Sequence, residues 1–280
     1  MSTGTPAVPL SPPRSRRPLA LWTGIVLAGF VIATALLGPF ISPHSPDAIL
    51  GAPFQGPSSD FPLGTDRLGR DVLSRLLHGG FELLALGGAT TVLAYIVGTA
   101  IGLYAGYCRS WVDGMLMRLM DGVIALPAIL LLLVLAAAMG PGPSMIVIGI
   151  AAVQIPFVAR LIRTATLEIA TRGYVEAAVA RGESTVSVMA REILPGLWKT
   201  IAAAAVPSLT GSILAIAALS FFGIGLQPPS SDWGSMINEN RPGLQLQAWG
   251  TVAPAAMIAV LVLGVNLIAD WRVRGQGRSL

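Results

Sequence analysis

Long apolar segments, separated by short polar stretches, make up most of this chain. Six of them stand out, at residues 19–40, 83–107, 119–139, 145–161, 201–226 and 249–269. A helix rises about 1.5 Å per residue, so about 20 apolar residues cross a hydrocarbon core of about 30 Å. The pattern therefore predicts an all-α membrane protein with six transmembrane helices.

The composition of the chain indicates the same class of protein. Of its 280 residues, 54% are hydrophobic and 11% are charged, whereas a soluble domain carries about 25% charged residues. Three arginines precede the first apolar segment, as in a signal peptide, but segment 19–40 exceeds the apolar core of a signal peptide, which has about 7–15 residues. We therefore expect residues 19–40 to be the first transmembrane helix. The Pro-, Ser- and Arg-rich residues 1–18 are expected to be a disordered cytoplasmic tail.

The basic residues indicate how the chain is oriented in the membrane. With the N-terminus in the cytoplasm, six spans leave all but four of the 18 basic residues on the cytoplasmic side, the exceptions being Arg67, Arg70, Arg75 and Arg241. Basic residues concentrate on the cytoplasmic side of membrane proteins. Both termini are therefore predicted to be cytoplasmic, including the C-terminal tail 271–280.

Two stretches are expected outside the membrane on the extracytoplasmic side. The first, 41–82, contains a predicted interfacial helix. In it an apolar stripe lies opposite polar residues, the stripe being Val72, Leu73, Leu76 and Leu77 and the polar set Arg70, Ser74 and Arg75. The second, 227–247, is either a solvated loop or a contact for a partner protein through Asp232, Trp233, Glu239 and Arg241.

The longest cytoplasmic loop, 162–200, contains the stretch "YVEAAVARGESTVSVMAREILPG" at 174–196. Good helix formers before Gly182 predict a short helix, and Gly182 breaks it because glycine costs about 1 kcal/mol in a helix interior. A second helix is expected to be capped by Ser184 or Thr185 and ended by Pro195. A polar loop of this length on a membrane protein favours a docking surface. The alternative is a solvated amphipathic loop with no partner.

Polar residues and prolines within the apolar segments are candidates for pairing or for transport. Asp121 is expected either to pair with Arg118 or to belong to a transport path. Gln154 and Asn266 are expected to bond neighbouring helices. Four prolines are predicted to kink helices, namely Pro127, Pro156, Pro207 and Pro254.

The sequence lacks the residues for chemistry of its own. Its only lysine, Lys199, follows "PGLW" and so lacks the glycine that a phosphate-binding loop requires before its lysine. The only histidines, His44 and His78, are not at ligand spacing with cysteine or carboxylates, and neither stands near a nucleophile. We therefore expect no catalytic residue, no bound cofactor and no metal in this chain.

The spacing of Glu176, Ala177, Ala178, Gly182 and Pro195 resembles the EAA loop in the membrane subunits of ABC importers. In that family the loop forms a coupling helix that inserts into a cleft of the cytoplasmic ATPase. The resemblance implies the ATPase-coupling role for Glu176, Ala177, Ala178 and Gly182. Pro195 completes the motif.

Three further stretches resemble one group within this family. They are "LGTDRLGRDVLSRLLHGG" at 63–80, "YCRSWVDGMLMRLMDGVIALPAILLLL" at 107–133 and "SFFGIGLQPPSSDWGSMI" at 220–237, and they are similar to oligopeptide, dipeptide and nickel permeases of the C-subunit type. This resemblance implies the type I ABC importer transmembrane fold, with a permease core over 83–270, in a bacterial cell membrane. The solute stays open among dipeptides, longer peptides, nickel chelates, glutathione, opines and other small solutes.

The resemblance also implies partners. These are a second homologous permease subunit, two cytoplasmic ATPase subunits that bind ATP and Mg, and an extracytoplasmic substrate-binding protein. The chief alternative is a secondary transporter driven by an ion gradient, which usually shows charged mid-membrane sites and internal repeats. A membrane-embedded enzyme would need a catalytic constellation, which the chain lacks, and the loop argues against a non-transporting membrane scaffold.

Overall fold

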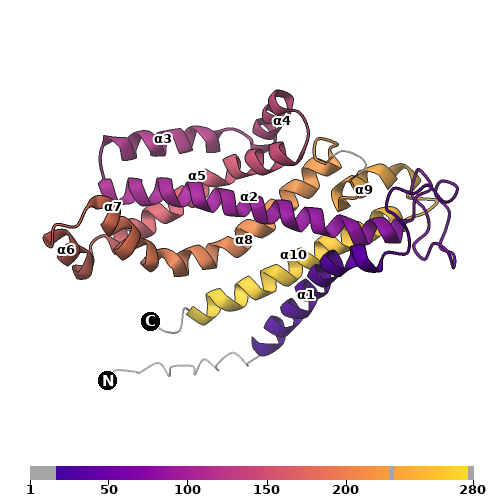
Figure 1. Ribbon diagram of the computed structural model, residues 1–280, viewed down its shortest axis with the longest axis horizontal. Helices are drawn as coiled ribbons and strands as arrows, with labels where there is room; N and C mark the ends of the chain where they lie inside the picture. Colours follow the sequence, from indigo (N-terminus) through magenta and orange to yellow (C-terminus); the bar gives the residue numbers. More distant parts are fainter. Residues whose placement is uncertain (1–16, 227–229, 277–280) are drawn as a thin grey trace, which may run out of the picture.

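The computed structural model describes residues 17–226 and 230–276, and most of these are helical (Figure 1). The long helices are α1 (Arg17–Ile41), α2 (Val72–Cys108), α5 (Pro143–Ile169), α8 (Leu194–Phe221) and α10 (Trp249–Gln276). The shorter ones are α3 (Trp111–Ala125), α4 (Ala128–Met139), α6 (Gly173–Ala180), α7 (Thr185–Val188) and α9 (Trp233–Asn240). The predicted disordered tail falls almost entirely outside the described residues.

Within residues 17–226 and 230–276, five stretches of helix are long and apolar enough to cross a membrane, and a bent pair, α3 with α4, makes a sixth when it counts as one span. The all-helical membrane fold is thus confirmed, and the predicted span 119–139 is not one continuous helix but is broken at Pro127, where a kink was predicted. The two halves meet at 93°. Leu126 has an extended backbone there (φ −81°, ψ 134°), because the ring of Pro127 disfavours helical geometry in the preceding residue. Pro156, Pro207 and Pro254, by contrast, lie inside helices without a break.

Several helix ends differ from the predicted ones. The expected interfacial helix is the first part of α2, whose N-terminus is capped by the Asp71 carboxylate through the backbone N–H groups of Leu73 and Ser74. At the other end of the molecule, α5 continues to Ile169 and shortens the predicted loop 162–200. Pro195 does not end a helix as expected but lies in the first turn of α8, and helical structure continues into it from α7 through a π-helical turn, Met189–Ile193.

Small residues allow α2 and α5 to pack closely. Gly98, Gly102 and Gly106 follow one another at every fourth position of α2 and so share one face. A Cβ added at Gly102 would lie 2.4 Å from the Ala159 carbonyl oxygen, and one at Gly98 would lie 2.7 Å from Val158. Such contact replaces the hydrophobic driving force that is missing between helices in lipid.

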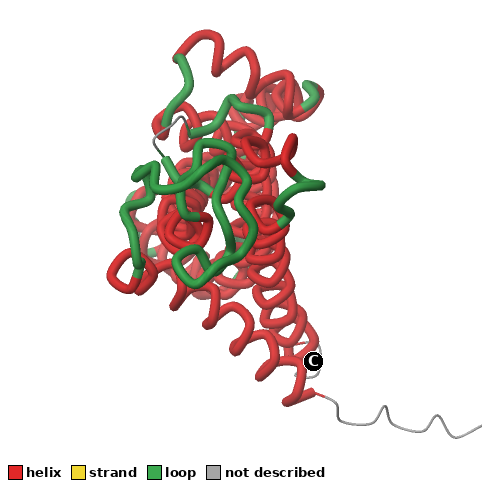
Figure 2. The backbone as a smooth tube through the Cα atoms, turned by 90° about the vertical axis from the view of Figure 1, so that its right-hand side faces the viewer, coloured by secondary structure: helices red, strands yellow, loops and turns green. Residues whose placement is uncertain are grey.

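The bundle has two distinct ends. In Figure 1, α6 and α7 lie at one end, and the segment that precedes α2 lies with α9 at the other. Figure 2 shows the loops that cover this second end. The start of α1 and the end of α10 both point toward the α6–α7 end, as expected for an even number of crossings. We refer to the ends as the cytoplasmic and the outer end, following the predicted orientation.

Candidate functional site

The α6–α7 loop is built around a tight turn at Gly182. The Gly182 N–H donates to the Val179 carbonyl at 2.9 Å, and the Glu183 N–H donates to the Ala178 carbonyl at 3.3 Å. These two bonds form a Schellman motif, which ends a helix with a residue of left-handed conformation. Gly182 has φ +81°, a value that glycine adopts without the steric penalty of a Cβ.

The residues after the turn fix its direction. The Ser184 hydroxyl accepts a hydrogen bond from the Ser187 N–H at 3.3 Å, which confirms the predicted cap at that serine. Arg181 pairs with Glu183 at 2.6 Å and approaches Glu192 to 3.9 Å. Hydrogen bonds from Arg181, and then from Ser187, hold the pKa of the Glu183 carboxyl below its usual range. The two short helices are therefore held at a defined angle.

One face of the loop is buried against the ends of α5 and α8. Val175, Ala178 and Val188 are at most 1% exposed and join a hydrophobic cluster with Ile162 and Leu197. Of the two alanines of the motif, Ala178 therefore packs its methyl group inward. A displacement of α6 would be transmitted to α5 and α8, because close-packed side chains transmit strain to their neighbours.

The opposite face of α6 is open. Glu176 and Ala177 are exposed, and among the described residues the Glu176 carboxylate has no hydrogen-bond or ion-pair partner. Tyr174, Val179 and Val186 are 42%, 52% and 70% exposed. The loop therefore presents a carboxylate within a partly apolar surface.

The fifth residue of the predicted site lies apart from this surface. Pro195 is exposed in α8 and lines a recess of about 390 Å³ together with Arg172 and Lys199. The structure thus brings Glu176, Ala177 and Gly182 to the exposed part of the loop, places Ala178 beneath them, and puts Pro195 at the base of α8.

Ion pairs near the same end join α3 to α5. Arg163 makes two hydrogen bonds to Asp113, at 2.7 and 2.6 Å. Asp121 pairs with Arg160, although Arg118 was the partner expected from the sequence. Gln154 bonds to α8 as expected, whereas Asn266 is exposed and makes no side-chain hydrogen bond with a described residue.

At the outer end, the sequence reasoning missed a buried group of charges, which we call the outer ion cluster: Asp66, Arg70, Arg75 and Glu239. Each of these side chains is at most 8% exposed. Arg70 and Arg75 therefore do not face solvent from an interfacial helix, because both are neutralised by Asp66 and Glu239. The spacing of Asp66 and Arg70, four positions apart, is a sequence signal for their pairing. No such signal exists for Glu239, which lies 164 positions beyond Arg75.

The loop 227–247 is also more buried than predicted. Residues 227–229 lie outside the described residues. Asp232 and Trp233 are fully buried, and the Trp233 indole N–H donates to the Leu76 carbonyl at 2.8 Å. Burial raises the pKa of the Asp232 carboxyl, although hydrogen bonds from the backbone N–H and the hydroxyl of Ser235 oppose the shift. Of the four residues expected to contact a partner, Arg241 is the exposed one.

A bundle of long apolar helices with a structured loop at one end defines the class of an integral membrane protein. Two inward-facing structures of the MetNI methionine ABC transporter share the fold, with TM-scores of 0.59 and 0.56, at 20% and 21% identity. They cover 72% and 71% of this chain and 95% of each matched chain.

Curated relatives agree with this class. The di/tripeptide transport system permease protein DppC of Pseudomonas aeruginosa is 36% identical, with 88% of this chain and 84% of the relative covered. The glutathione transport system permease protein GsiD of Pectobacterium atrosepticum is 38% identical, with 77% and 72% covered. A putative peptide transport system permease protein of Brucella suis is 35% identical, with 95% and 90% covered.

Residues 98–278 match the family described as binding-protein-dependent transport system inner membrane component. The chain belongs to this family. It is an inner-membrane permease subunit of the ABC importer type, which works with a binding protein, and the alternative of a secondary transporter driven by an ion gradient is wrong.

Proposed function

We propose that this subunit forms half of the translocation path of an ATP-driven importer for peptides or related small solutes. The names of its relatives, which refer to di/tripeptides, peptides and glutathione, support this solute class. The other half of the path is a second homologous permease subunit. Two cytoplasmic ATPase subunits bind ATP and Mg, and an extracytoplasmic binding protein delivers the solute.

The observation that carries the proposal is the exposed carboxylate of Glu176, which has no ion-pair partner in the part of the chain that the structure describes, on a loop shaped by the Gly182 turn. A carboxylate in this setting suits a guanidinium of a partner, with which it can form two parallel hydrogen bonds. The exposed side chains of Val179 and Val186 supply apolar area around it. These features favour α6 as the helix that docks on the ATPase, with Gly182 as the turn that aims it.

The buried face of the loop explains how docking would drive transport. Val175 and Ala178 contact the cluster that includes Ile162 of α5 and Leu197 of α8. Closure of the ATPase subunits on ATP would displace α6, and α5 and α8 would follow as rigid bodies. The path would then open alternately to the two sides of the membrane.

Co-purification of the membrane complex, followed by an ATPase assay, tests the proposal. We expect two ATPase chains to co-purify with the wild type, and hydrolysis to rise when peptide-loaded binding protein is added. The double variant Glu176→Ala with Gly182→Pro is expected to lose this stimulation. Asp60→Ala, which removes an exposed carboxylate from the segment before α2, is the matched control and should behave as wild type. Absence of any ATPase chain, or full stimulation in the double variant, would refute the proposal.

A further inference from the structure

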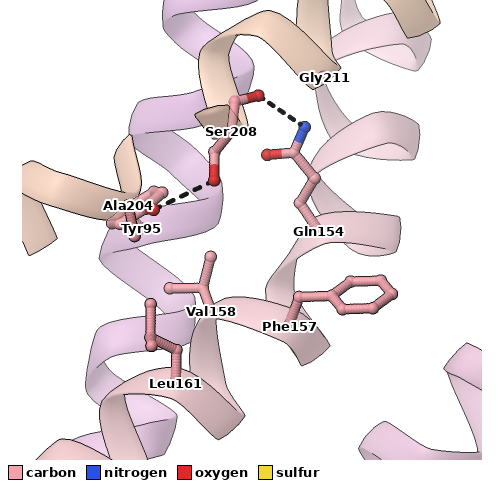
Figure 3. A pocket seen from close by; sticks show the side chains of 8 residues that line it. All are labelled: Tyr95, Gln154, Phe157, Val158, Leu161, Ala204, Ser208 and Gly211. Atoms are coloured by element: carbon pink, nitrogen blue, oxygen red, sulfur yellow. Dashed lines mark hydrogen bonds between the residues drawn. The ribbon is translucent and has the colours of Figure 1, made fainter. Parts of the chain in front are cut away.

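A groove of about 240 Å³ runs between α5 and α8, with α2 as its floor (Figure 3). Its apolar wall consists of Phe157, Val158 and Leu161, and its polar groups come from Tyr95, Gln154 and Ser208. Gln154 lies 11 positions, or about 16 Å, from the outer start of α5, and Ser208 lies about 21 Å from the start of α8. The groove is therefore near the middle of the spans.

The polar groups in the groove are ordered but incompletely satisfied. The hydroxyl groups of Tyr95 and Ser208 lie 3.1 Å apart, and the Gln154 amide donates to the Ser212 hydroxyl at 2.8 Å. Figure 3 shows Gln154 and Ser208 facing one another from neighbouring helices. The Gln154 Oε1 atom is buried, and it finds no hydrogen-bond partner among the described residues.

These groups argue against a groove that faces lipid. Hydrocarbon offers no hydrogen bonds, so exposed polar groups at this depth are unfavourable, and they commonly mark a solute path. None of the described residues that line the groove is charged. Hydroxyl and amide groups can hydrogen-bond neutral amide groups such as those of a peptide backbone. They offer no counter-ion to a charged group.

The α8 side of the groove leaves room for an occupant. Ala204, Ser208 and Gly211 all line the groove, and their spacing places them on one face of the helix. A Cβ added at Gly211 would meet no atom within 4 Å. The space is therefore open and is not filled by the chain's own side chains.

We infer that this groove is a weak solute-binding site within the translocation path, in which Gln154 and Tyr95 hydrogen-bond backbone amides of the passing peptide. The inference rests on the proposed function, whose solute class it uses. Contact through amides common to all peptides lets solutes with different side chains pass. Weak, uncharged contacts also allow release, which transport requires.

The test uses the complete complex, with its second permease subunit, ATPases and binding protein, in proteoliposomes with a radiolabelled tripeptide. Gly211→Leu fills open space, so it is expected to abolish uptake while the complex stays assembled with its melting temperature unchanged. Gly29→Leu is the matched control, because a Cβ at Gly29 of α1 also meets no atom within 4 Å, and it should transport as wild type. Gln154→Leu should raise the KM for uptake about three- to tenfold, the effect of losing one hydrogen bond.

Photo-crosslinking provides a readout that does not depend on these variants. Phe157, which is 57% exposed, is replaced by p-benzoylphenylalanine, and the label is expected to attach to the tripeptide during ATP turnover. Attachment to the second permease subunit alone, or dissociation of that subunit in Gly211→Leu, would show a subunit interface and overturn the inference. Wild-type uptake by Gly211→Leu would also overturn it and leave the proposed function intact. The proposed function would fail on a separate result, a wild-type complex that shows neither uptake nor stimulated hydrolysis.

Discussion

The Arg75 guanidinium of α2 lies 2.8 Å from the Glu239 carboxylate of α9, although 164 positions separate the two residues. The same nitrogen lies 2.7 Å from the Asp66 carboxylate. Both contacts are buried, and the Arg67 N–H adds a bond to the Asn240 side chain at 3.1 Å. The segment before α2 and the loop before α10 are therefore one structural unit at the outer end.

Substitution of Arg75 tests this unit. Arg75→Met leaves Asp66 and Glu239 with Arg70 as their remaining partner in the outer ion cluster, so one buried negative charge is no longer compensated, which is expected to cost about 3–5 kcal/mol in the free energy of unfolding. Thermal melting of the purified complex in detergent measures the effect. Arg67→Met removes an exposed arginine nearby. It should change the free energy of unfolding by no more than about 0.5 kcal/mol relative to wild type. Equal stability of the two variants would show that the buried pairing contributes little.

The close approach of α2 to α5 predicts opposite effects for two glycines of the same helix. Gly102→Ala places a Cβ 2.4 Å from the Ala159 carbonyl oxygen, so the helices must separate at a cost of about 1–3 kcal/mol. Gly88→Ala meets no atom within 4 Å and should be neutral or stabilising by up to about 1 kcal/mol. Denaturation of the two variants and of the wild type measures whether each substitution lowers or raises the free energy of unfolding. A destabilised Gly88→Ala with an unchanged Gly102→Ala would contradict the packing.

The positive φ of Gly182 predicts that different substitutions at this position destabilise the turn to different extents. Gly182→Val should destabilise the end of α6 by about 1–2 kcal/mol, because a Cβ is unfavourable in the left-handed region, whereas Gly182→Asn should cost less. Hydrogen exchange of the Glu183 amide reports local opening of the turn. Gly173→Val, at a glycine of α6 with open space around it and no positive φ, is the control and should leave this amide protected.

The pair of Arg181 with Glu183 predicts a pH dependence of the loop. Because the pKa of Glu183 is lowered in the folded loop, the stabilisation is present above its ordinary value of about 4.3. It is lost as the pH falls through the lowered value. Carbon-13 NMR titration of the Glu183 carboxyl should show a midpoint below that of an exposed glutamate. Arg181→Gln should move the midpoint upward, and an unchanged midpoint in that variant would assign the shift to another cause.

The helices and the turn at Gly182 could be predicted from patterns of residues that are close together in the sequence. Apolar length predicted the spans, since a helix satisfies its own backbone in lipid. The glycine at 182 and the serine at 184 predicted a turn and a cap, because each acts on backbone atoms within a few positions. The break at Pro127 was foreseen as a kink, but its 93° angle depends on how α3 and α4 pack.

The sequence by itself thus determined the class of the protein, the position of its apolar segments and the position of the loop that resembles the EAA motif. The tertiary structure alone decided that Arg75 is buried between Asp66 and Glu239, that Asp121 pairs with Arg160, and that Gln154 lies in an open groove. A charged or polar residue has the same local pattern whether water or a distant side chain solvates it. Its partner is set by helices that meet only in the folded bundle.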